Sequence, residues 1–232
     1  MNIEKGLERG VLYIVATPIG NNDDMSSRAR EILIACDRVA AEDTRRAARL
    51  LAELGGNQHK LISLHEHNED KLVDYLVGEL VKGASVALVS DSGTPLLSDP
   101  GYRLVKVASS SGISVRPIPG PSSIIAALSV CPLPAHPFCF VGFLPKKKKE
   151  LHSRLQELIK KTEAVVFFES PRRIRRTLSL LSTLTDRKIF LIKEMTKTFE
   201  DSWSGSASEL LFQLDQDPKG EFGGVLEKIE LS

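Results

Sequence analysis

Short apolar runs alternate along the first half of the chain with segments whose apolar residues recur at helical spacing. The runs read as strands at residues 11–16, 38–41, 61–64, 85–89 and 114–118. The segments between and after them read as helices at about 27–36, 45–54, 68–81, 102–109 and 124–130. A continuous apolar run is typical of a strand covered on both faces. Strands that alternate with helices predict a parallel α/β sheet.

A second alternation follows a stiff connector at residues 131–137, which holds three prolines. Strands are expected at 138–143, 164–168 and 188–192, and helices at 150–161 and 171–184. Ser206 and Glu209 form a capping box for a last helix that ends near Leu214. We therefore expect an α/β fold of two α/β domains with a ligand cleft between them. The expected divisions are an N-terminal domain at 1–130, a linker at 131–137 and a C-terminal domain at 138–232.

Three of the first-domain strands end in loops rich in proline and glycine, at residues 17–21, 90–101 and 119–123. The strands of a parallel sheet all point one way, so these loops are expected to share one edge. Ligands of open α/β sheets bind outside the carboxyl ends of the strands. The sequence therefore predicts a single site where the three loops meet.

The loop at 90–101 reads Ser-Asp-Ser-Gly-Thr-Pro-Leu-Leu-Ser-Asp-Pro-Gly. It carries the carboxylates of Asp91 and Asp99 and four hydroxyls, but neither lysine nor arginine. Loops that cradle polyphosphates usually bring glycines, a helix N-terminus and often a lysine. This chemistry instead favours a ligand with a ribose and a positive centre. The alternative is a turn whose residues hydrogen-bond to their own backbone.

Composition narrows the function classes further. The chain has 232 residues, 42% of them hydrophobic, and a net charge of +1, so any basic surface must be local. Its three cysteines show no Cys-x-x-Cys spacing, and it has no apolar run of membrane-spanning length. We expect a soluble cytoplasmic protein without membrane contact. Neither Gly-x-Gly-x-x-Gly nor a Walker motif is present, which argues against nicotinamide and P-loop enzymes.

Two expected helices begin with arginines, although cations at a helix N-terminus oppose the macrodipole. An incoming phosphate would make the placement favourable. The other interpretation is salt bridging to Glu42, Asp43 and Glu169. A four-lysine run at 146–149 either extends a phosphate-tracking face or is a solvated surface. The candidate RNA-binding residues are Arg46, Arg172, Arg173, Arg176, Lys146 and Lys147.

Other polar residues fall near strand ends. Glu169 and Glu194 lie at or just beyond the ends of second-domain strands, where they could act as a base or be rim charges. His65 and His67 could form a metal pair, but no further ligand stands at a suitable spacing, so no metal is predicted.

Seven motifs occur in one order and resemble those of the bacterial small-subunit (16S) ribosomal RNA cytidine 2′-O-methyltransferases of the tetrapyrrole-methylase superfamily. The resemblance runs from about Val11 to Gly220. The motifs are Val15–Asn21, Ala41–Arg45, His65–Glu69, Ser90–Gly101, Pro119–Ser123, Gly142–Pro145 and Phe168–Pro171.

The resemblance implies S-adenosylmethionine as methyl donor, 16S ribosomal RNA in the small ribosomal subunit as substrate and a homodimer. It implies donor contacts for Pro18, Ser90, Asp91, Gly93, Ser98, Asp99, Ser122 and Ser123, with Leu144 closing from the second domain. For catalysis we hypothesise Glu169 or Glu194 as the base. Arg45 or Arg172 would fix the neighbouring phosphate.

The chain departs from the family pattern at three places. Asn22 replaces an apolar residue, and Arg172 followed by Arg173 stands where the family often has His-Arg. After Phe222 the paired glycines weaken the expected closing strand, which leaves open whether the second domain is truncated. The alternatives are a corrin-type small-molecule methyltransferase of the same superfamily and a non-catalytic RNA-binding module.

Overall fold

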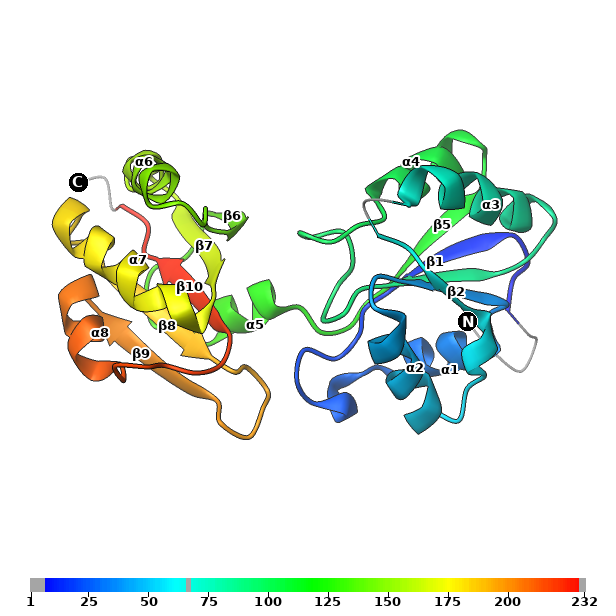
Figure 1. Ribbon diagram of the computed structural model, residues 1–232, viewed down its shortest axis with the longest axis horizontal. Helices are drawn as coiled ribbons and strands as arrows, with labels where there is room; N and C mark the ends of the chain where they lie inside the picture. The colour runs from blue at the N-terminus through cyan, green and yellow to red at the C-terminus, as the bar shows by residue number, and fades with distance from the viewer. Residues whose placement is uncertain (1–6, 66–67, 230–232) are drawn as a thin grey trace. The chain divides into compact units, whose positions relative to one another are not determined.

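The computed structural model describes residues 7–65 and 68–229. The chain forms two compact units, Met1–Ser122 and Ser123–Ser232 (Figure 1). The division lies earlier than the expected boundary at residue 130. The reason is helix α5 (Ser123–Ser129), whose Ile124 and Ala127 pack into a core cluster of the second unit.

The first unit is built on a fully parallel five-stranded sheet of order β3-β2-β4-β1-β5, which confirms the expected fold class. The strands are β1 (Val11–Val15), β2 (Arg38–Ala41), β3 (Leu61–Ser63), β4 (Val86–Val89) and β5 (Ser114–Ile118). Short 3₁₀ turns, η2 (Asn22–Asp24) and η3 (Gln58–Lys60), precede α1 and β3.

Helices cover both faces of this sheet (Figure 1). One face carries α1 (Ser27–Ala35) and α2 (Thr44–Glu53), and the other carries α3 (Glu69–Val81) and α4 (Tyr102–Ser110). Alternate residues of β1 enter the two cores, since Tyr13 packs on the α1 side and Leu12 on the α3 side. Burial on both faces explains why these strands read as continuous apolar runs.

The buried side chain of Lys60 caps the C-terminal end of α1. The Nζ atom of Lys60 donates to the carbonyl oxygens of Leu33 at 2.5 Å, Ile34 at 2.7 Å and Cys36 at 3.2 Å. The last carbonyls of a helix have no partner within the helix, and a cation there also suits the helix dipole. Lys60 therefore joins the start of β3 to the end of α1.

Lys60→Met is expected to lower the free energy of unfolding by about 2–3 kcal/mol, because three buried carbonyls lose a charged donor while the aliphatic stem stays. Urea denaturation followed by circular dichroism measures the change. Lys71→Met, at an exposed position on α3, is the matched control. Equal midpoints for the two variants would contradict this role.

The second unit contains a mixed five-stranded sheet of order β6-β7-β10-β8-β9. Its strands are β6 (Phe138–Phe143), β7 (Ala164–Glu169), β8 (Ile189–Lys193), β9 (Asp201–Gly205) and β10 (Phe222–Leu226). Besides α5, its helices are α6 (Lys148–Leu158), α7 (Pro171–Leu184) and α8 (Ala207–Gln213). Only β6 and β7 pair in parallel, and the other pairs are antiparallel.

The expectation of a weakened closing strand is wrong. Strand β10 lies in the middle of the second sheet, hydrogen-bonded to β7 and β8, and all five of its residues are buried. Its glycines have a packing reason. A Cβ atom on Gly224 would lie 2.2 Å from Cζ of Phe167, so the ring occupies the space that a side chain would need.

Among the described residues, no helix has the length and apolar character needed to cross a membrane.

Candidate functional site

The three proline- and glycine-rich loops meet at one edge of the first sheet, as the sequence predicts. Thr17 and Gly93 exchange backbone hydrogen bonds of 2.9 and 3.1 Å, which joins the first loop to the second. The hydroxyl of Thr94 donates to the carbonyl of Pro121 at 3.1 Å, which joins the second loop to the third. Residues far apart in the sequence therefore form one continuous rim.

The loop at 90–101 is held in a strained conformation. Leu96 and Ser98 have φ angles of 77° and 76°, in the left-handed region that side chains disfavour. The buried Ser90 hydroxyl donates to the carbonyl of Gly93 at 3.1 Å and closes the start of the loop. At its end, a Cβ atom on Gly101 would lie 2.6 Å from Cδ2 of Leu88. Strain of this kind is maintained where a loop must be pre-shaped for a ligand.

Carboxylates gather at this rim. Burial, together with the negative charges of Glu42 and Asp91, raises the pKa of Asp99 to about 6. Asp91 is fixed in turn, because its Oδ1 accepts a hydrogen bond of 3.1 Å from the backbone N–H of Asp43. The site thus offers a region of negative potential, which a cationic group would neutralise.

A pocket of about 160 Å³ opens beside these carboxylates, entirely within the first unit. Its walls are the loop after β1, one face of α2 and the end of β4. The lining residues are Thr17, Pro18, Asn22, Arg46, Ala47, Arg49, Leu50, Glu53, Val89, Ser90 and Asp91. The structure therefore brings together three residues that the sequence places in the site, Pro18, Ser90 and Asp91, with one predicted RNA contact, Arg46.

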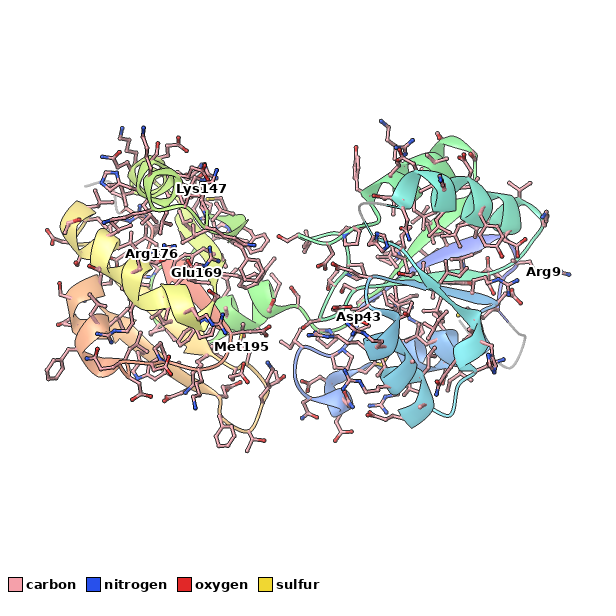
Figure 2. The ribbon with its side chains drawn as sticks, in the orientation of Figure 1. Arg9, Asp43, Lys147, Glu169, Arg176 and Met195 are labelled. Carbon is pink, nitrogen blue, oxygen red and sulfur yellow. The ribbon has the colours of Figure 1, made fainter. Side chains whose placement is uncertain are left out.

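Arg45 and Arg46 differ in their surroundings although they are neighbours. The guanidinium of Arg45 donates to both carboxylate oxygens of Asp43, at 3.0 and 2.7 Å, and it does not line the pocket. This pairing, with the N-cap hydrogen bond to the Arg45 amide, holds the pKa of Asp43 well below its usual range (Figure 2). Arg46 lines the pocket, with its Nε 3.6 Å from Oδ2 of Asp91. The contacts favour Arg46 over Arg45 as the residue that meets a substrate.

The carboxylate of Glu169 is buried and fully bonded. It accepts from the N–H of Ser170 at 2.8 Å and from the Thr177 hydroxyl at 2.9 Å, and it pairs with Arg173 at 2.6 Å. Figure 2 shows Glu169 at the level of α7, inside the second unit. A base must reach the proton that it removes. These contacts favour a scaffold role for Glu169 and argue against a base.

Arg173 is committed to the same network. Besides pairing with Glu169, it donates to the Ser170 hydroxyl at 3.0 Å and to the carbonyl of Leu144 at 2.9 Å. Its guanidinium thus holds the β6–α6 loop against α7, and the RNA contact expected of Arg173 stays a prediction.

Leu144 follows β6 in the same region. It is only 3% exposed and belongs to the main core cluster of the second unit. Its expected closure over a methyl donor stays a prediction.

Glu194 supports a turn. It has a φ of 51°, and its Oε1 accepts from the N–H of Glu221 at 2.9 Å and from Nζ of Lys197 at 3.0 Å. These hydrogen bonds lower the pKa of the Glu194 carboxyl. A lowered pKa makes it a weaker base, and its contacts hold the segment that enters β10.

The basic residues of the second unit lie at two neighbouring helix N-termini. Helices α6 and α7 follow the adjacent parallel strands β6 and β7, and neither helix has a side-chain cap. Arg176 donates to the carbonyl of Lys146 at 2.9 Å, which ties the two helix starts together (Figure 2). Lys147 pairs with Glu150 at 3.0 Å, and Arg172 is exposed. This edge can receive an anionic chain.

Two charged residues of the pocket escaped the sequence-based prediction, Arg49 and Glu53. Their signal is the helical spacing that they share with Arg46 on α2, which places all three on one face.

The possible metal pair of His65 and His67 is not tested, because His67 lies outside the described residues. No group of three or more His, Cys, Asp and Glu side chains in the described part could hold a metal ion.

Comparisons with known proteins agree with this architecture. A family model described as "Tetrapyrrole (Corrin/Porphyrin) Methylases" matches residues 11–211. The "Ribosomal RNA small subunit methyltransferase I" of Xylella fastidiosa (strain Temecula1) is 45% identical over 218 residues, which are 92% of this chain and 80% of that protein. The protein of the same name from Vibrio cholerae is 43% identical over 93% of this chain and 75% of its own length.

Solved structures show the same fold at low sequence identity. The uroporphyrin-III-C-methyltransferase of Thermus thermophilus has a TM-score of 0.63 and 19% identity, covering 94% of this chain and 95% of that chain. A diphthine synthase has a TM-score of 0.69 and 14% identity, covering 94% and 89%.

Proposed function

This chain belongs to the tetrapyrrole methylase family, and from that membership we propose that it methylates ribosomal RNA of the small subunit with S-adenosylmethionine. The single observation that carries the proposal is the relatedness to proteins named ribosomal RNA small subunit methyltransferase I, at 41–46% identity. We place the reaction at the 2′-hydroxyl of a cytidine, in the cytoplasm, and propose a homodimer as the active form.

The donor set of the first unit fits S-adenosylmethionine, which supplies a methyl group activated on a positively charged sulfur. The carboxylates of Asp91 and Asp99 favour that positive charge, and the 90–101 loop lacks cations that would repel it. The proposed donor contacts are Pro18, Ser90, Asp91, Gly93, Ser98, Asp99, Ser122 and Ser123. Their loops are pre-shaped, so binding costs little ordering.

RNA contacts are proposed for the basic edge of the second unit, at Arg172, Arg176, Lys146 and Lys147. The uncapped N-terminus of α6 presents backbone N–H groups to an anion there, and the side chains at the starts of α6 and α7 add positive charge. Phosphate contacts of this kind give register on the RNA and make binding depend on salt.

We propose that this chain accelerates methyl transfer mainly by alignment. Oxygen and methyl carbon must meet in line, and holding them so can supply much of the acceleration. The 2′-oxygen forms the new bond to carbon, the carbon–sulfur bond breaks and the proton passes to water. We propose that Glu169 and Glu194 support the second unit, because the hydrogen bonds described above occupy both carboxylates.

The test is methylation of small ribosomal subunits from a strain that lacks this activity. Nucleosides are analysed by mass spectrometry after incubation with protein and labelled S-adenosylmethionine, and 2′-O-methylcytidine is the expected product. Donor binding by calorimetry without RNA methylation would overturn the proposal in favour of a small-molecule substrate. An absence of donor binding would favour an RNA-binding module.

The affinity for S-adenosylmethionine is expected to rise about tenfold between pH 5 and pH 7, because the pKa of Asp99 in the unliganded protein is about 6. Below pH 6 the carboxyl is protonated and neutral, whereas above it the negative charge attracts the donor. Calorimetric titrations across this range measure the effect. Asp99→Asn should bind more weakly at pH 7 and lose the pH dependence, and a profile unchanged by that substitution would refute the assignment.

A further inference from the structure

The pocket beside α2 has two chemically different walls. One wall consists of Pro18, Ser90 and Asp91, which also belong to the proposed donor loops. The facing wall is the side of α2 that carries Arg46, Arg49 and Glu53. A group that enters this pocket therefore lies against the donor loops and against guanidinium groups at the same time.

Arg49 differs from the other charged residues of the pocket. Arg46 lies 3.6 Å from Asp91, and Glu53 accepts a hydrogen bond from Asn22. Arg49 is exposed, and within residues 7–65 and 68–229 it makes no hydrogen bond or ion pair. The fold thus leaves the N–H donors of the planar Arg49 guanidinium available. A guanidinium binds the oxygens of a phosphate in pairs.

The size of the pocket restricts its occupant. About 160 Å³ is well below the roughly 300–1,000 Å³ of clefts that enclose whole drug-sized ligands. This volume suits a small unit such as a sugar phosphate better than a whole planar macrocycle. The lining includes the apolar residues Pro18, Ala47, Leu50 and Val89, but each wall also carries polar groups that can meet ribose hydroxyls and a phosphate.

We propose that this pocket is the acceptor subsite, which receives the ribose-phosphate of the RNA nucleotide to be modified, with Arg49 binding its phosphate. The inference rests on the proposed function and adds a position for the substrate. Arg49 is a positioning residue in this scheme: it anchors the phosphate, and the sugar beside it then lies against the donor loops.

Arg49→Gln and the matched control Arg28→Gln, an exposed arginine of α1 outside the pocket, test the subsite. Initial rates are measured with small ribosomal subunits and S-adenosylmethionine varied separately, at several salt concentrations. Arg49→Gln is expected to raise KM for the RNA about tenfold and to leave KM for the donor unchanged. The salt slope of RNA binding should fall by about one. Arg49→Lys should restore part of the affinity, and Arg28→Gln should match the wild type.

Two results would overturn the subsite. One is an unchanged KM for RNA in Arg49→Gln, and the other is an increase in KM for the donor, which would assign Arg49 to the carboxylate of S-adenosylmethionine. If the wild type fails to methylate the subunits, the proposed function fails. Fluorescence anisotropy with a cytidine-containing RNA oligonucleotide then still tests the proposed subsite. Equal RNA affinities of Arg49→Gln and Arg28→Gln would refute the subsite. Thermal unfolding confirms that both variants are folded.

Discussion

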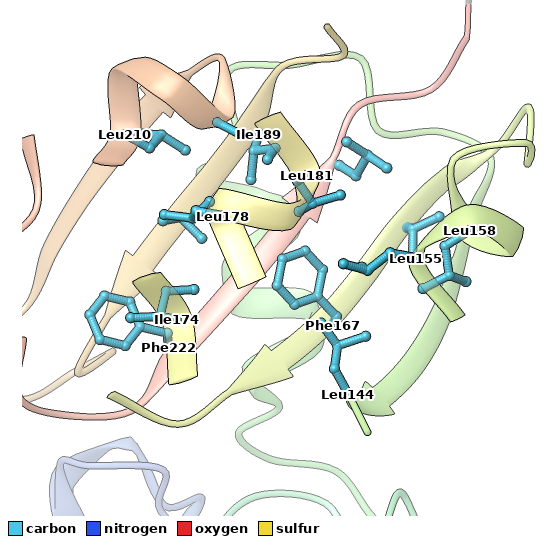
Figure 3. Close-up of a cluster of buried hydrophobic side chains, with 14 of the residues drawn as sticks. Leu144, Leu155, Leu158, Phe167, Ile174, Leu178, Leu181, Ile189, Leu210 and Phe222 are labelled. Carbon is cyan, nitrogen blue, oxygen red and sulfur yellow. The ribbon is translucent and has the colours of Figure 1, made fainter. Parts of the chain in front are cut away.

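Gly224→Ala is expected to destabilise the second unit by about 3 kcal/mol, because the new methyl group would overlap the ring of Phe167. The added Cβ atom would lie 2.2 Å from Cζ and 2.6 Å from both Cε atoms of that ring. The ring has little room to move, since Phe167 is buried within the same core cluster as Leu155 and Leu158 (Figure 3). Urea denaturation followed by fluorescence of Trp203 on β9 reports on this unit, because the chain has one tryptophan.

Gly223→Ala provides the matched control in the same strand. Its Cβ atom would lie 3.3 Å from Cγ2 of Ile192 and from Cε of Met195, and 3.9 Å from Cβ of Ala127, so shifts of a few tenths of an ångström relieve the contacts. A smaller loss is therefore expected. Combining Gly224→Ala with Phe167→Leu should recover part of the stability that Gly224→Ala removes. Equal losses for the two alanine variants would show that the ring is not the cause.

Glu169→Ala is expected to lower the free energy of unfolding by about 3 kcal/mol, because it leaves the partly buried Arg173 guanidinium without its counter-charge. The same substitution removes the acceptor for the Thr177 hydroxyl, which is also buried. Chemical denaturation of the single and double variants measures the coupling. Adding Arg173→Met should restore part of the lost stability, because it removes the unpaired charge.

Glu169→Ala also distinguishes a structural role of Glu169 from a role as general base. If Glu169 is a scaffold, methyl transfer per folded molecule should stay near that of the wild type at a temperature where the variant is folded. If Glu169 is the base, kcat should fall steeply under the same conditions, and its pH profile should lose the limb that reports the base. The second outcome would contradict the role assigned from the contacts.

The sequence predicts the first unit well because its signals are local. Strand 114–118 is predicted to the residue, and α1 begins at the expected position, where Ser26 caps it by accepting from the N–H of Ala29 at 3.2 Å. The shared edge of the three loops follows from parallel strands alone, since that topology fixes where all the strands end. Local caps and continuous apolar runs thus carry enough information to place the site.

The second unit contains features that only tertiary packing decides. Strand β9 reads Asp-Ser-Trp-Ser-Gly and has no apolar run to reveal it. Strand β10 looks weak until the ring of Phe167 is placed over Gly224. From the sequence alone, Glu169 is an accessible carboxylate at the end of a strand. In the structure, α7 places Arg173 and Thr177 in contact with it. In each case the deciding partner lies in another element, which spacing along the chain does not encode.

The position of β10 has a consequence for synthesis of the chain. Strands β7 and β8 have no direct contact in the sheet order, because the segment 222–226 lies between them. While the ribosome is still adding that segment, both strands have an open edge, although every strand of the first sheet has already been made. The first unit can therefore mature on the ribosome before the second, which must wait until the segment 222–226 has emerged.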